Sequence, residues 1–75
     1  MTLFDAAAGK NYLVKHINLK PGVLKRITNL GIFAGAVVFV VKKVGKFSPI
    51  LINCNGLNVA IGSDISKNIE ATDYE

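Results

Sequence analysis

Few side chains of this chain could carry out catalysis or hold a metal ion. The 75 residues include one histidine, His16, and one cysteine, Cys54, and both fall inside segments predicted to be strands. Nucleophilic catalysis needs a nucleophile, a base and an orienting group within mutual reach. The acids Asp64 and Glu70 belong to a charged C-terminal region, and neither a phosphate-binding loop nor a zinc-ligand spacing occurs. We therefore predict a protein that is not an enzyme and has no cofactor, no catalytic residue and no tight metal site.

The charge is unevenly distributed along the chain. Residues 1–46 contain eight of the nine basic residues and a single acid, Asp5, within a formal net charge of +4. The remaining segment has Lys67 against four acids. A basic body is typical of a protein that binds an acidic partner, nucleic acid or an anionic membrane surface. The same pattern also fits the solvated edges and loops of a small domain, so composition alone leaves these interpretations open.

Length and composition predict one domain over residues 1–75, with a flexible polar tail at 72–75. A single cysteine rules out an internal disulfide framework and favours a reducing compartment. The first residues lack the basic start and apolar run of a signal peptide. The longest apolar run, Leu30–Val41, has twelve residues, whereas a membrane span needs roughly 20. These features favour a reducing compartment and argue against a signal peptide and a membrane-spanning segment.

One helix is predicted, from Pro21 to Leu30. Val23, Ile27 and Leu30 follow the i, i+4, i+7 spacing of one helical face. Gly31 follows this face directly, and glycine is the residue that ends helices in the left-handed conformation. We therefore expect a positive φ at Gly31.

The helix is followed by a second turn at Gly35 and then by several short strands. Asn55-Gly56 is a strong signal for a two-residue hairpin. The predicted strands are 12–17, 37–43, 50–54, 57–61 and 68–71, with a turn or single helical turn at 62–67 and the run 37–41 buried. Residues Tyr12, Val14 and His16 are expected on one face of the first strand. The predicted core comprises Val14 or Ile17, Ile27, Leu30, Val38 or Phe39, Ile52, Val59 and Ile61.

The loop between the second and third strands places a cation beside an aromatic ring, at Lys46 and Phe47. An aromatic side chain could anchor a protein contact, or it could stack on a nucleic-acid base next to the charge. Phe47 could equally cap an open end of the barrel.

The segment Arg26–Gly35 resembles the R-L-x-x-L-G-h-x-P-G signature of the small ferrous iron transport A proteins (FeoA). The same pattern occurs in the C-terminal SH3-like domains of iron-dependent repressors. The similarity extends over residues 9–71. Ala34 replaces the usual proline, Gly62 stands where arginine is common, and Ser66 is polar where an apolar residue is usual.

This resemblance implies a mainly β fold: a small SH3-like barrel of about five strands, with one short helix between the first two strands and a short helical turn before the last. It also implies a cytoplasmic accessory protein of ferrous iron uptake that contacts the cytosolic region of a FeoB-type membrane GTPase permease. Weak self-association is compatible with this role. The alternatives are a basic small-barrel protein that binds nucleic acid, which we do not expect, and a direct Fe(II)-binding carrier. The candidate partner-binding residues are Lys25, Arg26, Phe33, Lys46 and Phe47, and the structural turn residues are Gly31, Gly35, Asn55 and Gly56.

Overall fold

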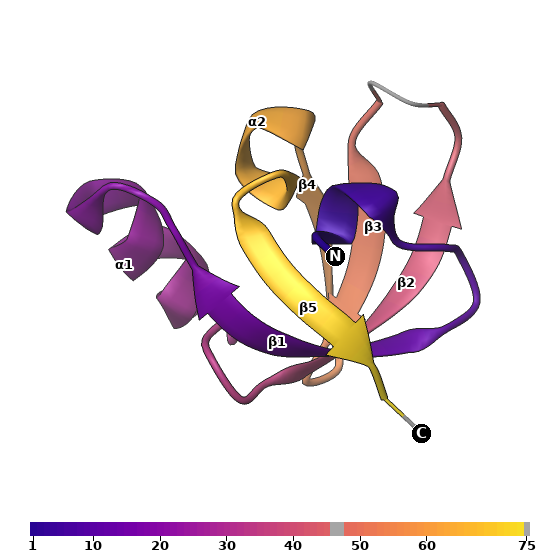
Figure 1. Ribbon diagram of the computed structural model, residues 1–75, viewed down its shortest axis with the longest axis horizontal. Helices are drawn as coiled ribbons and strands as arrows, with labels where there is room; N and C mark the ends of the chain where they lie inside the picture. The colour runs from indigo at the N-terminus through magenta and orange to yellow at the C-terminus, as the bar shows by residue number, and fades with distance from the viewer. Residues whose placement is uncertain (46–47, 75) are drawn as a thin grey trace.

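The computed structural model describes residues 1–45 and 48–74. Five antiparallel strands form one sheet in the order β4-β3-β2-β1-β5, and the sheet curls into a small SH3-like barrel (Figure 1). A helix, α1, lies between β1 and β2, and a short helix, α2, precedes β5. This is the predicted fold class. The strands are β1 (Asn11–Ile17), β2 (Val37–Lys43), β3 (Ile50–Cys54), β4 (Leu57–Ile61) and β5 (Ile69–Asp73), and the helices are α1 (Pro21–Asn29) and α2 (Ser63–Ser66).

The N-terminal segment covers the outer edge of β5. Thr2 forms an isolated antiparallel bridge with Glu70, and the Ala71 N–H donates to the Met1 carbonyl at 2.8 Å. A single 3₁₀ turn, η1 (Leu3–Asp5), then places Leu3 in the core, where it is fully buried. β5 itself ends at Asp73, two residues later than predicted. Thr72 and Asp73 pair with β1 and so belong to the sheet, not to the predicted tail.

The core lies between the curled halves of the sheet, and Ile27 of α1 and Leu3 of η1 are buried in it. Ile50, Ile52 and Cys54 all point into it, as their alternation predicted. The prediction that 37–41 is a buried run was wrong, because β2 alternates: Val38 and Val40 are fully buried, whereas Phe39 is 37% exposed. The core cluster comprises Leu3, Ala6, Tyr12, Val14, Ile27, Ile32, Val38, Val40, Ile50, Ile52, Cys54, Ile61, Ile69 and Ala71, with Ile17, Leu19, Val59 and Ile65 packed against it.

A bulge in β1 changes which side chains face the core. The register with β5 shifts between Val14, which pairs with Ala71, and His16, which pairs with Glu70. A bulge inserts one extra residue and therefore reverses the alternation beyond it. His16 is consequently exposed, and the prediction that it shares a face with Tyr12 and Val14 was wrong.

The end of α1 has the hydrogen bonds of a Schellman motif. The Gly31 N–H donates to the Thr28 carbonyl at 3.0 Å, and the Ile32 N–H donates to the Ile27 carbonyl at 3.1 Å. Gly31 has φ of +98°, which confirms the predicted left-handed helix stop. The last helical residue is Asn29, and Leu30 is the C-cap. Leu30 is therefore only half-buried, whereas Ile32 turns back against Ile27 and is fully buried.

The remaining turns follow their residue types. Asn55 and Gly56 have φ of 54° and 82°, as a two-residue type I′ hairpin requires. Gly35 has φ of +96° in the turn closed by the Ala36 N–H and the Phe33 carbonyl at 2.9 Å. Ser66 is the one buried polar side chain among residues 1–45 and 48–74, and its hydroxyl donates to the Ser63 carbonyl at 3.5 Å.

Candidate functional site

The exposed face of α1 and the turn that follows it form the first candidate surface. Lys25 and Arg26 are exposed, on the side of the helix away from the buried Ile27. Neither side chain contacts an acid among the described residues, whereas Lys10 pairs with Asp73 at 3.3 Å. The charges of Lys25 and Arg26 are therefore available to a partner. We call Lys25, Arg26 and Phe33 the helix-turn surface.

Phe33 lies at the edge of a shallow hollow and is 47% exposed. The hollow has a volume of about 260 Å³. It lies between the exit of α1, the start of β2 and the β3–β4 hairpin. The lining residues are Gly31, Phe33, Ala36, Val37, Cys54 and Asn55.

Cys54 has a structural role at the base of this hollow. Its thiol donates to the Gly31 carbonyl at 3.0 Å, which satisfies a backbone acceptor at the helix exit. Burial raises the pKa of the Cys54 thiol. The thiolate, which is the form that attacks electrophiles and binds metals, is therefore disfavoured.

The structure describes three of the five predicted partner-binding residues. Lys25, Arg26 and Phe33 belong to one helix-turn unit, whereas Lys46 and Phe47 lie outside the described residues. In Figure 1, α1 lies at the left of the molecule, and the end of β2 lies at the upper right. The prediction that all five residues contact one partner stays a prediction.

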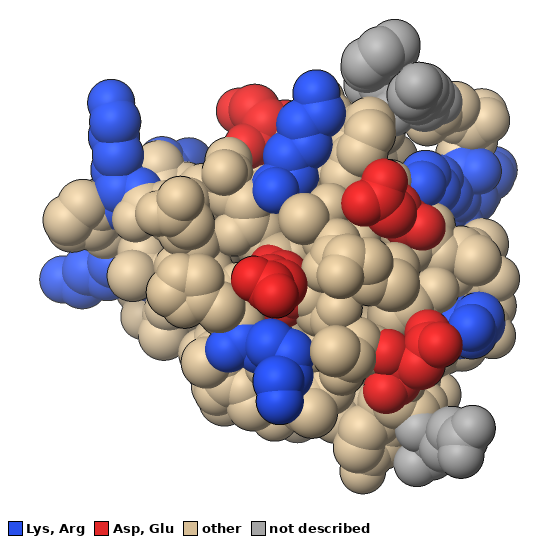
Figure 2. Space-filling view, in the orientation of Figure 1, with Lys and Arg blue, Asp and Glu red and all other residues tan. Residues whose placement is uncertain are grey.

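The charges differ between the α1 end and the rest of the face seen in Figure 2. In the view of Figure 2, the charged side chains over α1 are all basic, whereas acidic and basic side chains alternate over the rest of this face. The sequence explains the difference, because no acid occurs between Asp5 and Asp64. The α1 end therefore presents a positive surface.

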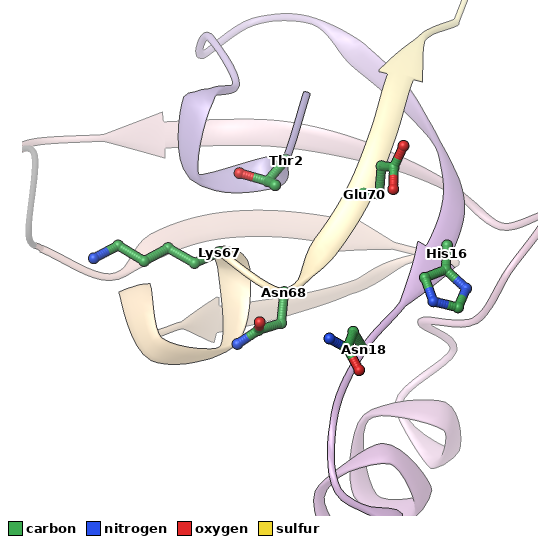
Figure 3. Close-up of a pocket in the computed structure, with 6 residues that line it drawn as sticks. All are labelled: Thr2, His16, Asn18, Lys67, Asn68 and Glu70. Carbon is green, nitrogen blue, oxygen red and sulfur yellow. The ribbon is translucent and has the colours of Figure 1, made fainter.

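A second, polar hollow of about 240 Å³ lies beside β5 (Figure 3). Glu70 sits between Thr2 and His16, because it pairs with Thr2 on one side and His16 on the other. Sequence reasoning missed this group, since the β1 bulge and the N-terminal bridge bring it together and neither has a sequence signal. The lining residues are Thr2, His16, Asn18, Lys67, Asn68 and Glu70.

The polar hollow offers hydrogen-bonding groups rather than a formed metal site. Of its lining residues, only His16 and Glu70 have side chains that commonly bind metal ions. Within residues 1–45 and 48–74, no three histidine, cysteine or acidic side chains lie together in a way that could hold a metal ion. In the same residues, no helix is long and apolar enough to cross a membrane.

Comparison with known proteins places these features in a family. A family model described as "FeoA domain" matches residues 1–73. The chain is 30% identical over 70 residues to a protein of Methanocaldococcus jannaschii named "Putative Fe(2+) transport protein A", and the match covers 93% of this chain and 83% of that protein.

Solved structures share the fold. The solution structure of FeoA protein from Chlorobium tepidum superposes with a TM-score of 0.90 at 27% identity, covering 100% of this chain and 71% of that one. Iron(II) transport protein A from Clostridium thermocellum superposes with a TM-score of 0.89 at 16% identity, and the match covers 97% of this chain and 45% of that one. The chain thus spans less than half the length of the latter protein. Because the family model covers nearly every residue, the chain belongs to the FeoA domain family.

Proposed function

We propose that this protein is a cytoplasmic accessory protein of ferrous iron uptake, which acts by contacting the cytosolic region of a FeoB-type membrane GTPase permease. The family membership supports this proposal, as do the names of the relatives, which refer to Fe(2+) transport. The absence of a preformed ligand cluster among the described residues favours a contact role over a direct Fe(II) carrier.

The observation that carries the proposal is the helix-turn surface. Phe33 is 47% exposed and borders an apolar hollow, so it can act as an aromatic anchor. Lys25 and Arg26 lie on the adjoining helix with no acidic partner among the described residues. Aromatic anchors supply much of the affinity of an interface, whereas exposed charges mainly steer the encounter. The surface therefore fits a partner with an acidic rim around an apolar recess.

The test is titration of the isolated cytosolic region of the transporter against wild type and matched variants. Phe33→Ala should weaken binding by about 1–2 kcal/mol, or roughly 5–30-fold. Phe39→Ala is the control, because Phe39 is the other exposed phenylalanine among the described residues and lies on β2. Equal effects of the two variants, with folding intact by circular dichroism, would place the interface elsewhere.

The charge contribution is tested by comparing two identical charge reversals. Lys25→Glu should slow association and reduce its salt dependence, whereas Lys42→Glu, on the exposed face of β2, should have little effect. A DNA or RNA oligonucleotide in the same assay tests the nucleic-acid alternative, since its binding would fall steeply with salt.

Lys46 and Phe47 are included in the same titration. Phe47→Ala is predicted to weaken transporter binding by about 1–2 kcal/mol, and Lys46→Ala is predicted mainly to change its salt dependence. If both variants bind like wild type while Phe33→Ala does not, the contact is confined to the α1 end.

A further inference from the structure

The outer edge of β4 lacks the features that usually protect an edge strand. Natural edges are blocked by charged side chains, proline, bulges or a covering segment. β4 has neither a charged residue nor a proline, and its register with β3 is continuous from Leu57 to Ile61. Within the described residues it pairs with β3 alone, whereas the N-terminal segment covers the edge of β5. β4 is therefore an open template for another strand.

The hairpin determines which backbone groups face this open edge. In the Asn55-Gly56 turn, Cys54 and Leu57 are the closing pair, which exchanges hydrogen bonds. Because hydrogen-bonded and non-bonded pairs alternate along an antiparallel ladder, the N–H and C=O groups of Val59 also point to β3. Those of Asn58 and Ala60, both exposed, point outward.

We propose that β4 pairs in an antiparallel manner with β4 of a second copy of this chain, in the register centred on Val59. In this register Asn58 lies opposite Ala60 of the second copy, and the reverse pair follows from the two-fold axis. The outward N–H and C=O groups of both residues then form four hydrogen bonds across the axis. Leu57, which is 48% exposed, lies opposite Ile61 of the second copy and loses contact with water.

Charge and pattern favour a second copy as the occupant. The chain carries a net charge of +4, yet residues 48–66 contain a single charged residue, Asp64. β4 and the segments that flank it therefore bring no basic residues of their own to the two-fold axis. The order Leu-Asn-Val-Ala-Ile is also self-complementary, since reversing it leaves apolar side chains opposite apolar ones on the inner face. A single strand pair is a small interface, so the dimer should be weak and form only at high protein concentration. This inference does not depend on the transporter contact.

The first test follows the folded chain over a wide concentration range. Sedimentation should show an average mass that rises toward that of a dimer. Amide hydrogen exchange should slow with concentration at Asn58 and Ala60, and change far less at Leu57 and Val59, whose amides already face β3. A monomer at all concentrations, with exchange at Asn58 and Ala60 unchanged, would overturn the proposal.

The second test examines the register with three double variants. Asn58→Lys/Ala60→Lys and Asn58→Glu/Ala60→Glu each place like charges opposite one another, whereas Asn58→Glu/Ala60→Lys places opposite charges there. All three lose the Asn53–Asn58 side-chain hydrogen bond of 3.0 Å, so that loss is shared. The mixed-charge variant should dimerise about tenfold or more tightly than either like-charge variant.

Net charge cannot explain that order, because one like-charge variant raises it and the other lowers it. Equal dimerisation of the three variants would refute this register. Protection of Asn58 and Ala60 that appears only when the transporter's cytosolic region is added would assign the edge to that partner instead and overturn self-pairing. Failure of this test leaves the Phe33 titration unaffected.

Discussion

A side chain at Gly31 would be unfavourable for two reasons, the positive φ of the backbone and the small space around the residue. A comparison with Gly35, which has a similar φ but open space, measures the two costs separately. The φ angles are nearly the same, +98° at Gly31 and +96° at Gly35. A Cβ at Gly31 would lie 3.3 Å from the Cys54 sulfur, whereas a Cβ at Gly35 would meet nothing within 4 Å. Alanine at Gly35 therefore measures the backbone cost alone, and alanine at Gly31 measures the backbone cost plus the contact.

The expected magnitudes follow from these two terms. A left-handed conformation costs an L-residue about 1–2 kcal/mol, so Gly35→Ala should lower the free energy of unfolding by that amount. The contact with Cys54 adds an overpacking cost of about 1 kcal/mol, so Gly31→Ala should lower it by about 2–3 kcal/mol. For a domain of this size, each kcal/mol shifts the Tm by about 4–8 °C.

The assay is urea unfolding of both variants, of Cys54→Ala, and of Gly31→Ala/Cys54→Ala. Without the Cys54 sulfur, the alanine at position 31 no longer meets it, so the overpacking cost should disappear. The double variant should therefore lose less free energy of unfolding than Gly31→Ala and Cys54→Ala lose in sum. Equal losses of unfolding free energy for Gly31→Ala and Gly35→Ala would show that the β3–β4 hairpin, which carries Cys54, shifts to accept the new methyl group at no cost. An unaffected Gly35→Ala would refute the backbone argument at both positions.

Three further predictions concern burial, protonation and metal binding. Ile32→Ala should cost about 2–5 kcal/mol, and Leu30→Ala distinctly less, because Ile32 is fully buried and Leu30 is not; equal losses in urea unfolding would contradict the C-cap assignment of Leu30. Because burial raises the pKa of the Cys54 thiol, its contribution is complete below the unfolded thiol pKa of about 8.5 and is lost as the pH rises through the folded value; the stability of wild type should therefore fall relative to Cys54→Ala in alkaline solution, and a constant difference would contradict this. Anaerobic calorimetry should detect no stoichiometric submicromolar Fe(II) site in the monomer, and such a site abolished by His16→Ala would restore the carrier hypothesis.

The fold could be predicted from local signals because most of its elements have strong ones. The alternation of Ile50, Ile52 and Cys54 fixed an inward face, and Asn55-Gly56 fixed a two-residue turn. Because the turn directly follows Cys54, these two signals together determine where β3 ends and β4 begins. The predicted bounds of both strands match the structure. A resemblance to a known family supplied the barrel, which local patterns alone do not determine.

The candidate sites were less predictable because they depend on register. The bulge between Val14 and His16 has no sequence signature, yet it decides that His16 faces solvent beside Glu70. A second register shift, between Val40 and Lys42, occurs in β2. Such shifts depend on pairing between distant segments, and an alternation rule applied to one strand cannot detect them.

The exposed position of Phe33 follows from the way in which α1 ends. The helix stops at Asn29, and the left-handed Gly31 directs the next residue, Ile32, back onto Ile27. Ile32 is the residue that enters the core after the helix. Phe33 therefore lies in the following turn, which contains Gly35, and Phe33 is 47% exposed. The helix stop thus has two consequences: it buries an isoleucine in the core and leaves an aromatic side chain exposed in the turn that follows α1. A substitution that moves the stop one residue later would put Phe33 at the buried position of Ile32 and Ile32 at the left-handed position of Gly31, so stability and partner binding should be lost together.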